Sequence, residues 1–377
     1  MLTEAMKMFD LEAPIFAFSH CRDVVAAVSR AGGIGTLGTT HITKEQLEIE
    51  LSWLDEHTNG RPYGVDLMFA SNAPKEYEGL TAADAGRYLP EEHRKFVADL
   101  LAKHDVPEFS PEDREAIFAD YMRGLVRTHK TAENRMEVVY QHPLARLLVS
   151  ALGVPPQHVL DRAHDHGIKV AGMVGKPEHA PKHVEAGVDI IIAAGYEAAG
   201  HTGDISTMVL VPQIVDLAAP IPVLHAGGIM RGRQIAAALA LGAQGVWTGT
   251  VWLGTAESEC TPLVKEKLFA ATSSDTLRSR CGTGKPARRL RSAWVDAWES
   301  KDAPDALPMP LQSMLVNEAL ERMDKYQPRA LVSYPAGQGV GMMTQETDVR
   351  SVVYDMLTEF GETMEGLCAS FNELNES

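Results

Sequence analysis

Cysteine and long apolar runs are scarce in this sequence, and each shortage excludes a class of protein. Its four cysteines, Cys21, Cys260, Cys281 and Cys368, stand far apart among 377 residues, and none forms a C-x-x-C pair. No secretory apolar region follows Met1, so we expect reduced thiols in a cytoplasmic protein. No stretch approaches the ~18 consecutive apolar residues of a membrane-spanning helix.

The sequence also has fewer basic than acidic residues, and this imbalance limits the possible ligands. The 35 Lys and Arg residues against 51 Asp and Glu residues give a formal net charge of −16. Such a charge repels nucleic-acid backbones and anionic membranes. We therefore expect no nucleic-acid partner and no membrane partner, and a phosphate-bearing ligand would need a locally positive pocket.

The remaining composition is that of an ordinary folded protein. Hydrophobic residues make up 45% and charged residues 23% of the chain, which has 31 glycines and no evident repeat or low-complexity tract. A length of 377 residues fits two or three domains of ~150 residues, or one α/β barrel with insertions.

Short apolar runs alternate with amphipathic helical patterns along much of the chain. This alternation is typical of parallel strands that are buried on both faces and joined by crossover helices. Eight runs have the character of strands: 14–19, 33–37, 63–69, 146–152, 169–174, 188–194, 222–226 and 245–249. The helical patterns lie at 22–30, 43–57, 155–166, 177–186, 207–217, 231–241 and 252–259. Eight such units predict an α/β fold, a (β/α)8 TIM barrel with its chemistry at the carboxyl ends of the strands.

Two segments depart from this rhythm. Residues 70–141 are charged, with helical patterns at 90–104 and 111–128, and predict a helical insertion after the third strand. Residues 261–377 include a basic run at 278–291 and helical patterns at 312–326 and 348–367, and predict a C-terminal extension packed on the barrel. The barrel would then comprise residues 1–69 and 142–260.

Glycines follow the seventh and eighth predicted strands, where barrels often bind phosphate. Gly227 and Gly228 come after one strand, and Gly249 and Thr250 end the other. Backbone N–H groups at such turns, the positive ends of helices and the Thr250 hydroxyl would together grip a dianion. The alternative is that these glycines only permit tight turns. The segment 282–285 has the sequence GTGK, but it lacks the preceding strand and the spacing of a P-loop.

A second glycine-rich loop, at 195–203, surrounds one histidine. Its small residues would let a flat ligand lie against the backbone. His201, with an ordinary pKa near ~6.5, could then exchange a proton with that ligand. The alternative is a merely polar loop residue, but a position at a strand's carboxyl end favours catalysis.

Three further side chains lie where predicted strands end. Lys176 could bring positive charge to the barrel mouth, or be a solvated surface residue. Asp66 could hydrogen-bond a ring N–H, or cap a loop. His225 could face the mouth, or pack in the core. His179 and His183 have helical spacing, but no carboxylate completes a ligand set, so we expect no metal site.

The residues of several segments resemble the FMN-dependent nitronate monooxygenases and their relatives, the FMN-dependent enoyl-ACP and quinone reductases. The similarity covers 14–69 and 146–258, including AAVSRAGGIG at 26–35, the loop at 195–203 and the segment 223–249. The tail segments GKPAR at 284–288 and AGQG at 336–339 also look like family signatures.

This resemblance implies a barrel that holds FMN at its mouth. The phosphate would lie on the glycine turns and Thr250, and Lys176 would lie near the flavin. The ring would rest near Ala17, Phe18, Ala199 and Gly200. His201 matches the histidine proposed as the family's catalytic base.

Departures from the family pattern concern the substrate more than the fold. Family members commonly carry Asn at the place of Asp66 and Ala at the place of His225, and the segment 16–21 also differs. The resemblance therefore implies that His20, His225 and Gln338 line a substrate pocket of this chain's own.

We expect an FMN-dependent oxidoreductase that oxidises alkyl nitronates with O2 to carbonyl compounds. One alternative is an NAD(P)H-dependent reductase of enoyl thioesters or quinones, although no dinucleotide fingerprint is visible. Another is a barrel that binds a phosphate ligand without catalysis. The insertion could also support a homo-oligomer.

Overall fold

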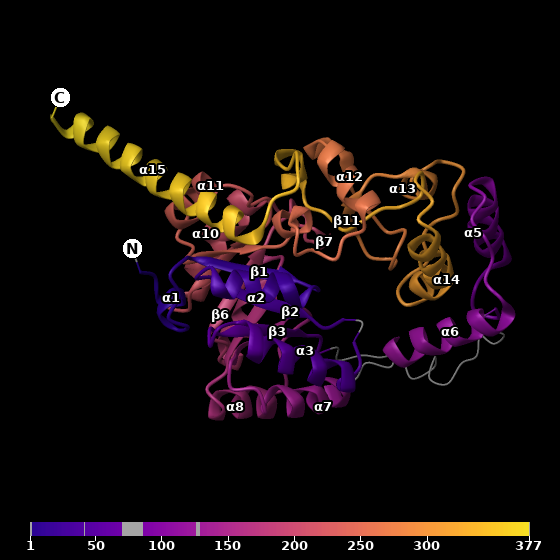
Figure 1. The fold of residues 1–377 in the computed structure, drawn as a ribbon, viewed down its shortest axis with the longest axis horizontal. Coiled ribbons are helices and arrows are strands. Elements are labelled where there is room, and N and C mark those ends of the chain that lie inside the picture. The colour runs from indigo at the N-terminus through magenta and orange to yellow at the C-terminus, as the bar shows by residue number, and fades with distance from the viewer. Residues whose placement is uncertain (1, 41, 70–85, 126–128, 377) are drawn as a thin grey trace.

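The computed structural model describes residues 2–40, 42–69, 86–125 and 129–376, and its central element is a closed barrel of eight parallel strands (Figure 1). Neighbouring strands follow the chain order, and the last strand pairs with the first. The strands are β1 Ile15–Ser19, β2 Ile34–Gly38, β3 Tyr63–Leu67, β4 Ala145–Ser150, β5 Lys169–Val174, β6 Ile190–Ala194, β8 Val223–Ala226 and β9 Gly245–Thr248. The predicted (β/α)8 barrel is confirmed.

Helices follow the strands and cover the outside of the barrel. They are α2 Arg22–Arg30, α3 Lys44–His57, α7 His129–Val139, α8 Gln157–Asp165, α9 Ala180–Ala186, α10 Thr207–Ala218 and α11 Gly232–Ala240. Local chemistry starts several of them. In α3, for example, the Thr43 side chain accepts a hydrogen bond from the Gln46 amide and so caps the first turn.

The predicted helix at 252–259 is wrong. The chain instead forms a short 3-10 helix, η3 (Thr250–Gly254), and then α12 (Pro262–Ala270). Thr255 adopts an extended conformation and bridges to Thr347, which ends the first turn. Thr261 then caps α12, whose first position is a proline.

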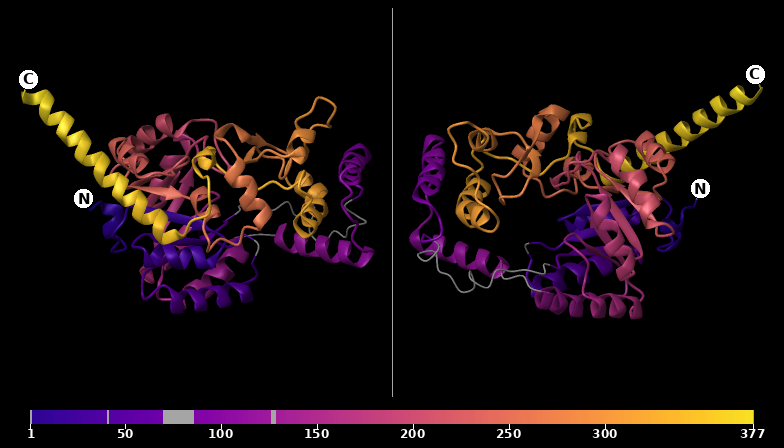
Figure 2. Two further views of the ribbon diagram at one scale, coloured as in Figure 1. Left: turned by 45° about the horizontal axis from the view of Figure 1, so that its top comes forward. Right: turned by 180° about the vertical axis from the view of Figure 1, so that it is seen from behind.

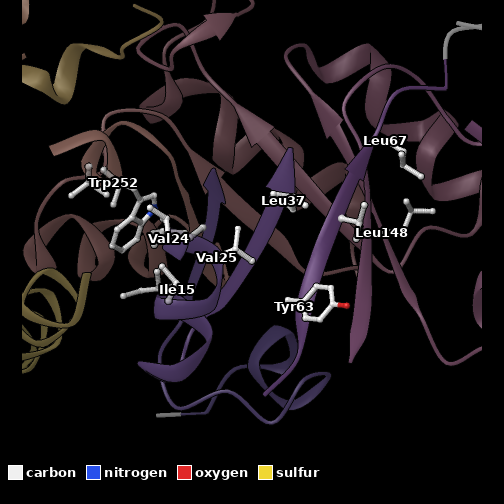
Figure 3. Packing of buried hydrophobic residues seen from close by; sticks show 14 of the residues in the cluster. Ile15, Val24, Val25, Leu37, Tyr63, Leu67, Leu148 and Trp252 are labelled. Carbon is white, nitrogen blue, oxygen red and sulfur yellow. The ribbon is translucent and has the colours of Figure 1, made fainter. Parts of the chain in front are cut away.

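The alternation of side chains along each strand produces two layers of core. Phe16, Ile190 and Leu224 belong to a cluster inside the barrel, whereas Ile15 and Val223 face the surrounding helices. Figure 3 shows part of the layer between strands and helices. A short helix, α1 (Glu4–Lys7), contributes buried residues to the inner cluster.

A second core lies away from the barrel (Figures 1 and 2). It combines α5 (Glu91–Lys103) and α6 (Pro111–Leu125) with α13 (Ala293–Trp298) and α14 (Leu311–Tyr326), so helices of the insertion and of the tail share one apolar cluster. By contrast, α7 packs on α3 as part of the barrel's outer layer. The division of the chain at 70–141 and 261–377 stays a prediction, and its residues 70–85 and 126–128 lie outside the described residues.

The rest of the tail meets the barrel in two places. The basic run forms a hairpin of β10 (Thr276–Ser279) and β11 (Ala287–Leu290), and β7 (Gly200–His201) adds to its edge. The sequence pattern does not indicate this sheet, because arginines occupy positions where strands usually carry apolar residues. The last helix, α15 (Val349–Glu376), packs on α11 and α2 and is longer than predicted. Among the described residues, no helix is both long and apolar enough to cross a membrane.

Candidate active site at the barrel mouth

The turn after β8 has a backbone that only glycine adopts easily. Gly227 and Gly228 have φ values of 130° and 71°. A Cβ atom on Gly227 would lie 3.1 Å from the Thr207 side chain and 3.2 Å from the Ala198 amide nitrogen. Gln234 anchors this turn, because its amide group donates to the Gly228 carbonyl oxygen at 2.8 Å and accepts from the Met230 amide at 2.7 Å. The turn is thus both tight and held in place.

The turn after β9 lies beside a loop from the tail. Gly249 precedes the short helix that Thr250 begins. The Thr250 hydroxyl oxygen accepts a hydrogen bond from the Gly337 amide at 2.9 Å, which leaves its own hydrogen to donate to a ligand. The amide of Gln338 donates to the Glu197 carbonyl oxygen at 2.9 Å. The structure therefore places the Gln338 backbone beside the loop at 195–203.

The surface at these turns suits an anion. Gly227, Gly228, Gly249 and Thr250 are all partly exposed, so no side chain of the described residues closes them off. Glu197 is the nearby carboxylate, and its oxygens accept from the Thr207 amide and hydroxyl at 3.0 Å. Its charge is thereby directed to the start of α10. The donors offered to a ligand are backbone N–H groups and one hydroxyl.

His201 lies on β7, at the edge of the small sheet. Its Nε2 is 2.8 Å from the Thr283 hydroxyl oxygen, which fixes the orientation of the ring. Surrounding protein atoms lower the pKa of His201, and the positive charge of Lys285 lowers it further. The imidazole, although exposed, is therefore neutral at pH 7 and able to accept a proton.

Two arginines of the hairpin hold the loop that carries His201. Arg288 is 2% exposed and donates to the Tyr196 carbonyl oxygen at 3.2 and 3.1 Å. Arg278 pairs with Asp204 at 2.6 Å and donates to the Thr202 carbonyl oxygen. Both guanidinium groups also lie over the Tyr196 ring. In the sequence, these arginines stand out only as part of the basic run at 278–291, which does not indicate what their side chains contact.

Asp66 occupies the inner wall of the barrel mouth. Asp66 lies on the same face of β3 as Gly64, and a Cβ on Gly64 would contact Leu147 of the inner cluster. The Asp66 side chain therefore faces the inside of the barrel. Its Oδ1 is buried and has no hydrogen-bond partner among the described residues. Burial raises the pKa of Asp66 to about 8, although a hydrogen bond with the Ala151 backbone opposes the shift. Asp66 is thus a mostly neutral carboxyl group at pH 7.

Aromatic side chains form another part of this wall. The Phe18 ring lies 6.2 Å from that of Trp247 and 5.1 Å from that of His20. The Nδ1 of His20 is 2.9 Å from the Gly38 carbonyl oxygen. Ala17 points the other way, into the layer under the helices, so that only its backbone could meet a ligand.

The remaining predicted residues are divided between the mouth and the core. Lys176 is exposed just beyond β5. A Cβ on Gly203 would overlap the Gly175 carbonyl, so the Lys176 turn abuts the His201 loop, where Ala199 and Gly200 also lie. His225 lies on the strand face of Val223, toward the helices, and is 7% exposed. Burial lowers the pKa of His225, against the opposing effects of Glu197 and the Gly227 backbone.

His179 and His183, the pair with helical spacing, differ in exposure, and His179 is exposed. His183 is buried beneath β5, where a Cβ on Gly172 would overlap its ring. In the described part of the chain, no group of three or more His, Cys, Asp or Glu side chains could hold a metal ion.

Comparison with known sequences finds relatives along nearly the whole chain. The family model described as nitronate monooxygenase matches residues 2–359. The "Putative monooxygenase Rv1533" of Mycobacterium tuberculosis is 50% identical over 374 residues, 97% of this chain and 98% of that protein. A "Probable nitronate monooxygenase" of Staphylococcus saprophyticus is 31% identical over 336 residues, 84% of this chain and 85% of that protein.

Solved structures show the same architecture. A nitroalkane oxidase from Streptomyces ansochromogenes has a TM-score of 0.76 and 27% identity, covering 96% of this chain and 99% of that one. A mutant of FabK from Thermotoga maritima has a TM-score of 0.71 and 25% identity, covering 98% and 100%.

Proposed function

This chain belongs to the nitronate monooxygenase family, and from that premise we propose that it is an FMN-dependent oxidoreductase that oxidises alkyl nitronates with O2 to carbonyl compounds. One observation carries the proposal. The loop of His201 runs against the glycine turns, since Gly227 abuts Ala198 and Gly337 abuts Glu197. The loop of the proposed proton acceptor and the turns that would bind an anion therefore lie side by side.

The residues at the mouth fit FMN on physical grounds. Its phosphate is a dianion, which suits the backbone N–H groups of Gly227, Gly228 and Gly249 and the Thr250 hydroxyl. The Oδ1 of Asp66, which has no partner in the part of the chain that the structure describes, offers a hydrogen bond to the polar edge of a ring. Lys176 would add positive charge on the side of the His201 loop. The ring would lie against Phe18 and the backbone of Ala17, Ala199 and Gly200.

FMN, when bound, supplies the electron-accepting chemistry that oxidation of the nitro-bearing carbon requires. The chain supplies the rest. Where the substrate arrives as the neutral nitroalkane, neutral His201 accepts the proton of the carbon that bears the nitro group, which leaves the nitronate. Thr283 holds the imidazole in position for that transfer. Arg288 and Arg278 keep the loop in place while the charge on the imidazole changes.

The test is to load the purified protein with FMN and mix it with propane-2-nitronate. Without air, we expect loss of the oxidised-flavin absorbance. In air, we expect uptake of O2 and formation of acetone. Nitronate that leaves the spectrum unchanged under both conditions would contradict the proposal.

The sequence resemblance to FMN-dependent enoyl-ACP and quinone reductases favours one second candidate, a reductase that takes hydride from NADH or NADPH and passes it to an enoyl thioester or quinone. Rapid loss of flavin absorbance on adding NADH or NADPH, with no nitro compound present, would support it. A barrel without catalysis is the third possibility. It would be supported if His201→Ala bound FMN normally and left every measured turnover unchanged.

A further inference from the structure

The last helix extends far beyond the body of the molecule. The first half of α15 packs on α11 and α2, where Val353 and Met356 are 3% and 2% exposed. From Glu365 to Glu373 every residue is exposed. Figures 1 and 2 show this half of the yellow helix leaving the barrel. The family model ends at residue 359, just before this tip, which we define as residues 361–376.

The apolar stripe of α15 continues along the tip. Apolar residues recur at alternating spacings of four and three, at Val353, Leu357, Phe360, Met364, Leu367 and Phe371. This is the heptad pattern of helices that pair side by side. The barrel covers the beginning of the stripe, whereas Leu367 is 56% and Phe371 64% exposed. The same face that packs on the body therefore continues into solvent as an apolar face.

The charges of the tip identify what kind of helix suits that face. The positions that flank the stripe are small and uncharged: Gly361, Thr363, Cys368 and Ser370. The carboxylates of Glu362, Glu365 and Glu373 lie on the outer face instead. In paired helices, charges at these flanking positions determine which helix is accepted as a partner. The flanking positions of this tip carry no charge. Two copies of this acidic helix can thus approach without bringing like charges together.

A membrane surface suits the tip poorly. Helices that lie on membranes usually carry Lys and Arg on their polar face. The tip has no basic residue, and its carboxylates would be repelled by anionic lipid.

We propose that the tip of α15 pairs with the tip of a second copy of this chain in antiparallel orientation, making a homodimer. The orientation follows from the body, because the chain's own barrel already covers the stripe up to Phe360. A second helix must therefore enter from the free end. With Leu367 of one copy beside Phe371 of the other, the heptad spacing brings the two Cys368 residues to the same edge.

The proposal is independent of the catalytic one, and the test measures mass rather than turnover. Light scattering after size exclusion of the full chain should give twice the chain mass of 41.0 kDa. Leu367→Glu places a charge in the seam and should halve that mass. Ala369→Glu adds the same charge on the outer face of the same helix turn and should leave the mass doubled. Circular dichroism checks that each variant is folded.

A bismaleimide cross-linker tests the orientation. Cys368 is exposed, whereas Cys21 and Cys281 are buried. The unmodified chain should give a cross-linked dimer, and Cys368→Ser should give none. A monomeric wild-type chain at tens of micromolar, a Leu367→Glu variant that stays dimeric, or a dimer that no reagent joins at Cys368 would each overturn the proposal.

Discussion

Two ionisable side chains at the barrel mouth are held neutral near pH 7, from opposite directions. The pKa of His201 is lowered, because its surroundings and Lys285 disfavour a positive ring. The pKa of Asp66 is raised, because burial disfavours a carboxylate. A neutral imidazole accepts a proton, and a neutral carboxyl group donates a hydrogen bond. We therefore expect His201 to act on a ligand as a base and Asp66 to act as a hydrogen-bond donor.

His201 should determine the acid limb of the pH profile. With neutral 2-nitropropane as the substrate, whose proton His201 would remove, we expect His201→Asn to lower kcat/KM by about 10²–10⁴-fold, the usual contribution of a general base. In the wild type, kcat/KM should hold down to ~pH 6.5 and fall only in more acid solution, because protonation inactivates a base whose pKa lies below the ordinary value. Steady-state rates across pH 5–8 measure this.

A matched variant tests the cause of that shift. Lys285→Gln removes a positive charge and should move the acid limb toward higher pH, with little change of the rate at pH 8. An acid limb that His201→Asn retains unchanged would show that another group titrates.

Asp66 should make the protein less stable as pH rises. Its folded-state pKa of about 8 exceeds the ordinary value of 3.8, so the folded chain binds a proton that the unfolded chain releases. The stabilisation is complete below the unfolded pKa and is lost as pH rises through the folded one, by up to about 1.4 kcal/mol per pH unit. Asp66→Asn should abolish this slope.

Urea unfolding at pH 5, 6.5 and 8 measures the effect. The difference in unfolding free energy between Asp66→Asn and wild type should grow in favour of the variant from pH 5 to pH 8. A constant difference would mean that Asp66 titrates as an ordinary carboxylate.

At the scale of elements, a three-stranded sheet from distant parts of the chain positions the loop that carries His201. β7 carries His201, while β10 and β11 carry the arginines that hold its backbone. The sequence predicted His201 because a histidine among small residues stands out. The sequence could not predict the role of Arg288, because that arginine acts by donating to a backbone carbonyl group 92 positions away in the chain.

Arg288→Met should damage stability and catalysis together. It leaves the Tyr196 carbonyl and the Thr276 hydroxyl without their buried donor, at a cost of about 1–3 kcal/mol in unfolding free energy. Because the His201 loop loses its anchor, kcat should fall more than KM rises. Arg291→Met, at an exposed ion pair with Asp296, is the control and should cost less than about 1 kcal/mol.

The contact between α11 and α15 depends on one glycine. A Cβ on Gly232 would overlap the backbone of Met356 and Phe360. Gly232→Ala should therefore lower the unfolding free energy by about 1–3 kcal/mol or detach α15. Gly361→Ala, within α15 and with open space around it, should raise it by about 0.5–1 kcal/mol. Equal thermal shifts in the two variants would contradict the contact.

At the scale of the whole molecule, the proposed binding site lies at the mouth of a barrel within a chain of net charge −16. Because the overall charge repels a dianion, only the local donors of the glycine turns can attract it. We therefore expect the phosphate of the ligand to contribute more to the binding free energy than its ring does. Ligands that bind the folded state alone stabilise it according to their concentration, by about 2.7 kcal/mol at 100 times Kd.

FMN should raise the melting temperature of flavin-free protein, whereas riboflavin, which has the ring without the phosphate, should do so far less at the same concentration. Thermal shift assays with both ligands measure this. Equal shifts would mean that the glycine turns do not grip the phosphate.

The sequence by itself determined the barrel, and it singled out the glycine turns and His201 as the predicted site. These features depend on local periodicity and on residues adjacent to strand ends, which a single chain displays directly. The tertiary structure alone decided that the Oδ1 of Asp66 is buried without a partner among the described residues, that His225 faces the helices and that arginines of the tail hold the His201 loop. These properties depend on burial and on hydrogen bonds between residues that are distant in the chain. Neither can be inferred from the spacing of residues along the sequence.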